Sequence, residues 1–359
     1  MGKTSKEPFV AALKDEQTGL REQFDNRQQK KEFLPIEEAR ANHDQPDWTG
    51  YTPPVPAHYG VQDPVTFSVA DLRPYIDWTP FFIAWEMKGK YPDIFEDPKV
   101  GEVAKNLHKE ANEMLDWLKQ GQRLHAKGRT GVFAANAEGD DILLYTDASR
   151  QNELARFHTL RQQAKKREGE RNKAMSDWVA PVGSGLDDAL GLFIVSAGYG
   201  IDELVAEFEA QHDDYQAILL KAVADRLAEA AAEKMHEIVR TQTWGYAPNE
   251  SLRNDQLILE EYAGIRPAPG YPAQPDHTEK IKLFELLEGE SVMGVHLTQQ
   301  LAMHPASSVC GLYFSHPEAR YFNVGPLLKD QVEEYATRKG MSVKEMETWL
   351  ASHLGYRAS

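Results

Sequence analysis

Apolar residues recur every three or four positions along several stretches of the chain, which is the spacing of one face of an α-helix. This pattern predicts amphipathic helices over residues 103–118 and 213–242, and shorter helices over residues 202–211 and 278–288. Residues 331–350 show the same spacing, interrupted once by a glycine, so two closing helices are expected there.

Shorter apolar runs without helical spacing predict β-strands. Residues 131–136 and 141–146 are separated by a short link, so they should pair as an antiparallel hairpin. Three more strands are predicted over residues 191–196, 308–314 and 320–324, with the last two facing each other across the turn between them. Strands linked by hairpins, with helices segregated from them, favour an α+β fold over an alternating α/β fold.

The first 50 residues are polar and dense in Gln, Lys, Glu and Asp. Four apolar residues within them recur near helical spacing: Phe9, Leu13, Leu20 and Phe24. We therefore expect residues 1–50 to form a partly helical linker or arm, and residues 51–359 to form one domain.

Composition excludes several classes of function. The chain has 359 residues, 41% of them hydrophobic, which is enough for a sizeable core. Its formal charge of −16 argues against binding to nucleic acid or to anionic membrane surfaces. No apolar run approaches a membrane span, and the N-terminus lacks the apolar core of a secretory signal. The single cysteine, Cys310, excludes an intrachain disulfide and a cysteine-cluster metal site, so a cytoplasmic protein with no metal ligands of its own is expected.

Two familiar catalytic patterns fail on inspection. A Rossmann loop needs three glycines at fixed spacing and an acidic residue further along the chain. The glycine pairs at residues 182–185 and 197–200 lack both, which disfavours an ordinary Rossmann-type methyltransferase. His236 begins a sequence like that of a zinc-protease helix, but Arg240 stands where the second histidine ligand must be.

A proline-rich loop at residues 264–272 is the most distinctive stretch of the chain. Its three prolines fix φ and remove backbone donors, and Gly270 admits a turn with positive φ, so neither a helix nor an inner strand is possible. The planar fork of Arg266 suits a carboxylate, and the carbonyl and amides around Ala268 could read the edge of a flat heterocycle. On this pattern alone, a surface turn with a solvated arginine remains equally open.

A single carboxylate, Asp77, lies among large apolar and aromatic residues at positions 75–82. An acid in such surroundings needs a partner, because an unpaired buried charge is very costly. Asp77 could cap a helix that starts near Pro80, or it could accept a hydrogen bond from a ligand ammonium.

Three further features could have either a structural or a functional role. Asp225 and Glu229 stack on one face of the predicted helix 213–242, where paired acids are usually solvent-facing. Tyr321 can offer its hydroxyl and backbone to a ligand, although most strand tyrosines only pack. The basic run at residues 161–171 is either a solvated face or a docking patch for an acidic redox partner.

The loop sequence Arg-Pro-Ala-Pro-Gly-Tyr-Pro at residues 266–272 resembles the R-x-x-x-G-Y-P signature of the S-adenosylmethionine-binding activation domain of cobalamin-dependent methionine synthase. Residues 75–82, 209–215, 244–250 and 313–317 are similar to other blocks of this family, in the same order. The resemblance extends from about residue 45 to the C-terminus.

The resemblance implies a curved single domain with a twisted antiparallel sheet flanked by helices. It places the methionyl amino group of the ligand on Asp77, and further ligand contacts on the two residues that follow the last turn, Tyr321 and Phe322. The helix that carries Glu229 borders the ligand pocket in this family. The predicted binding residues are therefore Asp77, Glu229, Arg266, Ala268, Tyr271, Tyr321 and Phe322.

The resemblance also implies a reaction. In this family, cob(II)alamin is reduced by one electron from flavodoxin or a flavoprotein reductase, and is trapped by methyl transfer from S-adenosylmethionine. The cobalt-ligating D-x-H-x-x-G motif is absent from this chain, so cobalamin is expected on a separate domain or subunit, which would be a partner of this chain. We therefore expect a part of methionine synthase, acting in methionine biosynthesis, that binds S-adenosylmethionine but is not active alone.

Two functions of other classes remain open. One is a stand-alone S-adenosylmethionine-dependent methyltransferase with a small substrate, and the other is a non-enzymatic interaction domain that uses the proline loop as a peptide-like surface. No activated cysteine, lysine or serine is visible, so no catalytic residue is assigned.

Overall fold

The computed structural model describes residues 10, 12–19 and 32–358, and the chain forms two compact units. One unit combines Met1–Asp44, Arg161–Ala174 and Val324–Ser359, and the other combines Gln45–Leu160 and Met175–Asn323. The second unit begins a few residues before the boundary predicted at residue 51. The first unit contains two later segments of the chain in addition to the N-terminal one, an arrangement that the sequence pattern did not suggest.

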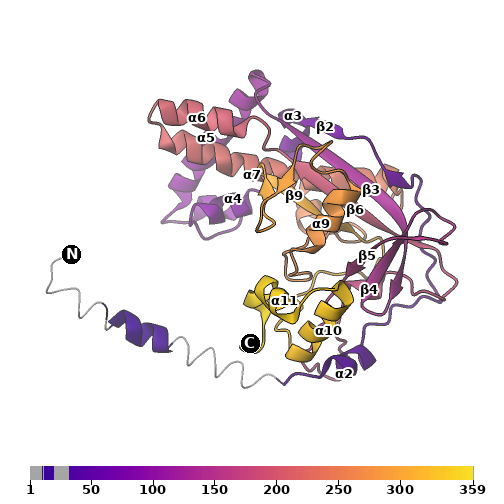
Figure 1. Cartoon of the computed structure of the whole chain (residues 1–359). Coiled ribbons are helices and arrows are strands. Elements are labelled where there is room, and N and C mark those ends of the chain that lie inside the picture. The colour runs from indigo at the N-terminus through magenta and orange to yellow at the C-terminus, as the bar shows by residue number, and fades with distance from the viewer. Residues whose placement is uncertain (1–9, 11, 20–31, 359) are drawn as a thin grey trace. The chain divides into compact units, whose positions relative to one another are not determined.

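The helices of the first unit that Figure 1 labels are α2 (Ile36–Ala41), α10 (Lys329–Lys339) and α11 (Val343–Trp349). The buried side chain of Gln331 joins α10 to the segment 161–174, because it accepts from the amide of Arg161 at 2.7 Å and donates to the carbonyl of that residue at 2.9 Å. The predicted break between the closing helices is confirmed, since α10 ends at Gly340 in the left-handed region.

Two other predictions fall on this unit. Residues 12–19 are helical, but Phe9, Leu20 and Phe24, which contributed to the prediction of that helix, lie outside the described residues. Within the basic run, Lys165 pairs with Glu32, so part of the positive charge of the run is compensated.

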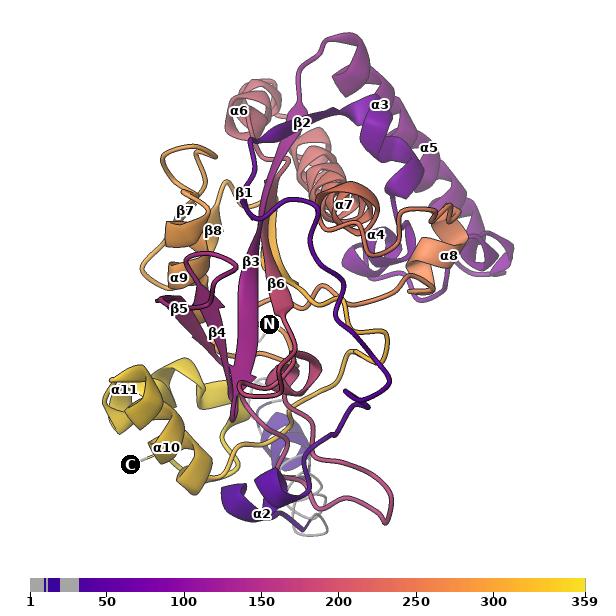
Figure 2. The ribbon, with the colours of Figure 1, turned by 90° about the vertical axis from the view of Figure 1, so that its right-hand side faces the viewer.

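The second unit is built on a sheet in which every pair of neighbouring strands is antiparallel, with the order β5-β4-β3-β6-β9. One edge of the long strand β3 pairs with β6, and its other edge pairs in turn with β2, β1 and β4 (Figures 1 and 2). The strands are β1 (Gly60–Val61), β2 (Val65–Ser68), β3 (His125–Glu138), β4 (Asp141–Tyr145), β5 (Glu153–His158), β6 (Asp188–Ser196) and β9 (Ser308–Tyr313). The predicted hairpin is confirmed as β3–β4, and the α+β class is confirmed with it.

One predicted strand is wrong. Residues 320–324 have no strand conformation, and the edge of the sheet beyond β9 is occupied instead by the start of the proline loop. Ile265 exchanges two backbone hydrogen bonds with Phe314, at 3.1 and 3.0 Å, so residues 320–324 do not add to β9 there.

Helices cover the sheet on both faces, and Figure 2 shows α7 on one side and α9 on the other. The helices of this unit are α3 (Val69–Leu72), α4 (Thr79–Ala84), α5 (Gly101–Gln120), α6 (Ile201–Ala210), α7 (Asp214–Ile238), α8 (Asn254–Ile258) and α9 (Glu279–Leu286). A small hairpin joins β7 (His296–Leu297) to β8 (Met303–His304). No helix within the described ranges is long and apolar enough to cross a membrane.

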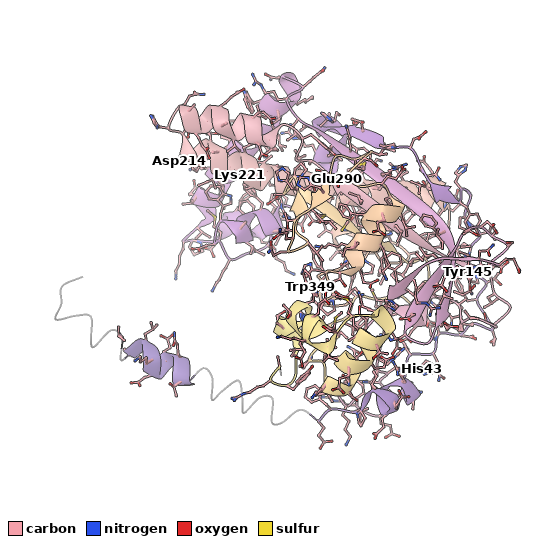
Figure 3. All side chains as sticks on the ribbon, viewed as in Figure 1. His43, Tyr145, Asp214, Lys221, Glu290 and Trp349 are labelled. Carbon is pink, nitrogen blue, oxygen red and sulfur yellow. The ribbon has the colours of Figure 1, made fainter. Side chains whose placement is uncertain are left out.

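Strand β6 explains why the sheet needs cover on both faces. Phe193 and Val195 are buried in the core with α5 and α7, whereas Leu192 and Ile194 are buried in the core with α9. Successive side chains of a strand point to opposite faces, so a run that is apolar at every position must be covered on both. Side chains fill these layers in Figure 3, where Asp214 marks the start of α7.

Candidate functional site

The proline loop is attached to the sheet through its carbonyl groups. Pro267 has no amide hydrogen, but its carbonyl accepts from the amide of Leu312 on β9 at 2.8 Å, next to the Ile265–Phe314 pair. Proline is excluded from inner strands because it has no amide hydrogen to donate to a neighbouring strand. At the edge of a sheet that hydrogen is not needed, so proline can pair there through its carbonyl. The pairing fixes the start of the loop and thereby the backbone of Arg266.

Gly270 shapes the middle of the loop. Its φ of 100° lies where residues with a side chain are rarely found, and a Cβ atom there would lie 2.3 Å from the ring of His277. The amide of Gly270 donates to the carbonyl of Gln274 at 2.7 Å, and Tyr271 donates to the carbonyl of Ala268 at 3.1 Å. The predicted turn at Gly270 is therefore confirmed, and it leaves the side chain of Tyr271 exposed.

Arg266 is not a solvated arginine on a surface turn. Its Nη2 donates to Glu233 on α7 at 2.7 Å, its Nη1 donates to the hydroxyl of Tyr262 at 2.6 Å, and its backbone amide donates to the hydroxyl of Tyr321 at 3.0 Å. Burial lowers the pKa of this guanidinium, but Glu233 together with the tyrosines around it outweighs burial, and the pKa is raised. Arg266 is thus a fixed cation in a partly buried position.

Further charges are buried behind Arg266. Arg240, with no exposed side-chain surface, donates to both carboxylate oxygens of Glu250 at 2.6 to 3.0 Å, and its Nη1 lies 3.7 Å from Glu233. Burial raises the pKa of Glu233, and the two arginines oppose that rise. We call Glu233, Arg240, Glu250 and Arg266 the buried charge cluster; its two cations and two anions balance.

His236 is packed against this cluster in its neutral form. Its ring stacks on that of Tyr313, with centroids 4.9 Å apart, and one nitrogen lies 3.4 Å from Nη1 of Arg266. Burial, and then the charges of Arg240 and Arg266, lower the pKa of His236 well below its ordinary value. The imidazole is therefore uncharged at neutral pH.

Asp77 lies just before α4 and also lines a cavity. Its Oδ1 accepts from the amide of Thr79 at 2.9 Å, at the first turn of α4, so it does serve the start of a helix. It also lines a cavity of about 400 Å³ together with Arg266 and Tyr271. The two charged residues that were predicted to hold an amino-acid moiety therefore face the same cavity.

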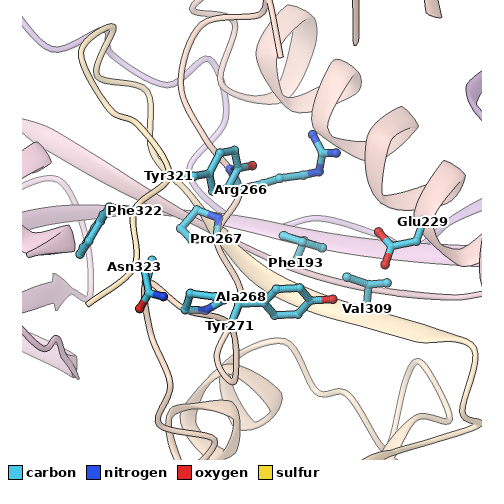
Figure 4. Close-up of a pocket in the computed structure, with 12 residues that line it drawn as sticks. Phe193, Glu229, Arg266, Pro267, Ala268, Tyr271, Val309, Tyr321, Phe322 and Asn323 are labelled. Carbon is cyan, nitrogen blue, oxygen red and sulfur yellow. The ribbon is translucent and has the colours of Figure 1, made fainter. Parts of the chain in front are cut away.

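A second cavity, of about 450 Å³, lies over the proline loop and the sheet (Figure 4). It shares Glu229, Arg266 and Tyr271 with the first, so the two adjoin. In Figure 4 the ring of Tyr271 points toward the helix that carries Glu229. The second cavity is lined by Phe193, Glu229, Arg266, Pro267, Ala268, Tyr271, Pro272, Ala273, Val309, Tyr321, Phe322 and Asn323.

Every residue predicted for the site lines one or both of these cavities. Asp225, the other acid considered on α7, lines neither cavity. It accepts a hydrogen bond from the hydroxyl of Ser307 at 2.8 Å. One turn further along the helix, Glu229 is half-buried and lines both.

The side chain of Cys310 is buried, which raises its pKa to about 12, so the thiol stays protonated at neutral pH and is not a nucleophile.

Residues 68–340 match the family model described as the activation domain of vitamin B12-dependent methionine synthase. The chain belongs to this family. It is also similar to a solved structure, the crystal structure of the MetH reactivation domain bound to AdoHcy, with 52% sequence identity and a TM-score of 0.87. That match covers 90% of this chain and 99% of the other. The resemblance inferred from the loop and its neighbouring blocks is thereby confirmed.

In this activation domain, the residues that sequence reasoning missed are those that support the predicted ones. Glu233 follows Glu229 by one turn of α7, so the same i,i+4 argument that selected Asp225 and Glu229 would have found it if carried one step further. Tyr262 carries no comparable signal in a single sequence. Its contact with Arg266 depends on the path of the chain between α8 and the sheet edge.

Proposed function

We propose that this chain binds S-adenosylmethionine in the two adjoining cavities and presents its methyl group for reductive reactivation of cob(II)alamin in cobalamin-dependent methionine synthase. The observation that carries the proposal is the division of the site: Asp77 and Arg266, of opposite charge, line one cavity, and the other is lined mainly by apolar and aromatic side chains and by the proline loop. S-adenosylmethionine has the same division, with a charged amino-acid moiety at one end and an adenine at the other.

The charged cavity suits the amino-acid moiety. Asp77 supplies an anion for the ammonium group, and Arg266 supplies a cation for the carboxylate. Arg266 is held from two sides by Glu233 and Tyr262, so little rotamer freedom remains to be lost when a ligand binds.

The second cavity suits the adenosine moiety. Phe193, Phe322 and the aliphatic Val309 provide apolar walls, and the loop backbone around Ala268 provides hydrogen-bonding groups that can read the edge of a purine. Volumes of about 400 and 450 Å³ fall within the range of small-molecule pockets. The AdoHcy bound in the similar crystal structure differs from S-adenosylmethionine by one methyl group, which supports the same ligand class here.

This chain provides binding and orientation, and the methyl acceptor must come from elsewhere. Reduced cobalamin, when it is held against the site by a separate domain or subunit, supplies the nucleophile. We propose flavodoxin or a flavoprotein reductase as the electron donor, the cytoplasm as the location, and a role within methionine synthase in which the isolated chain does not make methionine.

Calorimetric titration with S-adenosylmethionine tests the binding step, and we expect saturable binding of one ligand per chain. Absence of binding would refute the proposal and leave the interaction domain as the surviving alternative. Methyl transfer is then followed by the absorbance of methylcobalamin after a cobalamin-binding domain and a reductant are added. Methyl transfer to a small substrate without any cobalamin domain would favour the stand-alone methyltransferase instead.

A further inference from the structure

Tyr262 touches the predicted site without lining either of its cavities. The residue is 7% exposed and lies in the segment between α8 and the proline loop. It lines a third cavity, of about 410 Å³, together with Tyr321; Arg266 does not line that cavity. A ligand in the two binding cavities would therefore not contact Tyr262 directly.

The ring of Tyr262 lies close to both guanidinium groups of the buried charge cluster. The Cζ of Arg240 lies 4.5 Å from the ring centroid and the Cζ of Arg266 lies 5.4 Å from it. His236 packs edge-on against the same ring, with centroids 4.9 Å apart at 78°. These contacts fix the plane of the ring and therefore the position of its hydroxyl.

The hydroxyl of Tyr262 connects the two ends of the site. It accepts from Nη1 of Arg266 at 2.6 Å, while the backbone amide of Arg266 donates to the hydroxyl of Tyr321 at 3.0 Å. Burial raises the pKa of Tyr262, with Arg266 opposing the rise and Tyr321 adding to it, so the hydroxyl keeps its proton at neutral pH. It can then donate that proton toward Tyr321 while it accepts from Arg266.

We propose that Tyr262 is a positioning residue: its hydroxyl orients the guanidinium of Arg266 for the ligand carboxylate. The inference rests on the proposed function. The reason is geometric. Without the Tyr262 hydroxyl, Nη1 keeps only its longer contact with His236, at 3.4 Å, and the guanidinium can turn about its contact with Glu233. Short contacts on two different nitrogens fix both its position and its plane.

The test compares two ligands and the variant Tyr262→Phe, which keeps the ring and removes only the hydroxyl. One ligand is S-adenosylmethionine, and the other is its decarboxylated form, which retains the ammonium, the sulfonium and the adenosine. We expect Tyr262→Phe to weaken S-adenosylmethionine binding about tenfold, the effect of one hydrogen bond to a charged group, and to change binding of the decarboxylated ligand less than about twofold.

Tyr199→Phe is the matched control. The hydroxyl of Tyr199 donates to the carbonyl of Met293 at 2.5 Å and lines neither binding cavity. Its removal also costs a tyrosine hydrogen bond, here to a neutral carbonyl, so Tyr199→Phe should lower thermal stability somewhat but leave both affinities unchanged.

A second variant keeps the proposal testable if Tyr262→Phe folds poorly. In Arg266→Lys, the lysine ammonium keeps the charge but lacks the planar fork that contacts Glu233 and Tyr262 together. This variant should therefore show the same selective loss of affinity for the carboxylate-bearing ligand. Where Tyr262→Phe does fold, adding it to Arg266→Lys should weaken binding no further, because no fork is left to orient.

Equal losses for both ligands in either variant, or no loss, would overturn the inference while leaving the proposed function intact. Failure of the wild-type chain to bind either ligand would instead refute the proposed function, and the inference with it.

Discussion

The two adjoining cavities are built in different ways. At the charged end, Arg266 depends on Glu233 and Tyr262, which lie 33 and 4 positions away in the sequence, and the cation is stabilised by other buried charges. At the apolar end, the loop backbone around Ala268 is fixed by hydrogen bonds to the adjacent strand β9, and the walls are ordinary core side chains. The first arrangement depends on electrostatic balance, and the second depends on local geometry and packing.

This difference predicts which property of the protein a substitution at each end will change. Removal of one member of a buried charge cluster leaves the others uncompensated, which costs stability as well as ligand binding. Loss of a packing residue at the apolar end leaves a smaller defect that neighbouring side chains partly fill. Substitutions within the buried charge cluster should therefore change both folding and affinity, whereas those at the apolar end should mainly change affinity.

Arg266→Ala should have the largest effect. It removes the proposed contact to the ligand carboxylate and also leaves Glu233 with only Arg240 at 3.7 Å as a cationic partner. We expect binding of S-adenosylmethionine to become undetectable by calorimetry, and the free energy of unfolding in urea to fall by about 3 kcal/mol. Unchanged stability would show that Glu233 does not need the cation, and the comparison of the two ends would lose its basis.

Asp77→Asn should come next. The amide oxygen can still accept from the amide of Thr79, so the start of α4 is preserved, but the negative charge for the ligand ammonium is lost. We expect at least about a tenfold loss of affinity for S-adenosylmethionine, with the free energy of unfolding changed by less than about 1 kcal/mol. Affinity equal to that of the wild type would assign Asp77 to helix capping alone.

Sequence reasoning succeeded at the apolar end because its determinants are local. Prolines and a glycine in the loop specified a stiff turn, and the apolar runs of β6 and β9 specified buried strands, all within a few residues. The predicted strand over residues 320–324 failed for a non-local reason, since the partner that occupies the edge of β9 comes from residue 265. Strand pairing between distant segments cannot be read from either segment alone.

At the charged end, the sequence indicated the two residues that we propose to meet the ligand, but not those that hold them. Asp77 was identifiable as an acid in apolar surroundings, and Arg266 as a guanidinium on a rigid loop. Arg240 attracted attention only as the residue that spoils a zinc motif, yet its side chain is fully buried in the cluster. Counter-ions of this kind are selected by tertiary contact, which leaves no spacing rule in the sequence.

The pH dependence of stability should also distinguish the ends, and its effect is smaller. His236 is surrounded by Arg240, Arg266 and three tyrosines, and its folded pKa is well below that of the unfolded chain. Below about pH 6.5 the unfolded chain therefore binds a proton that the folded chain does not, so stability is lost as the pH falls, by up to about 1.4 kcal/mol per pH unit.

The measurement is the free energy of unfolding of the wild type and of His236→Gln between pH 7.5 and about 5.5. The raised pKa of Glu233 contributes with the opposite sign, and its contribution largely cancels when the two proteins are compared. The variant should lose less stability than the wild type as the pH falls. Parallel curves would mean that His236 is protonated in the folded chain, which would contradict its placement against two guanidinium groups.

Phe322→Leu should have the smallest effect and is confined to the apolar end. The ring of Phe322 lines the second cavity and packs edge-on against Trp178, with centroids 5.5 Å apart at 72°. Leucine keeps much of the volume but loses the flat face, so we expect affinity for adenosine and for S-adenosylmethionine to fall by the same factor, about threefold, with little change in unfolding. Because this wall is independent of the charges, the factor should be the same at pH 6 and pH 8. A loss restricted to S-adenosylmethionine would place Phe322 against the amino-acid moiety and reverse the assignment of the two cavities.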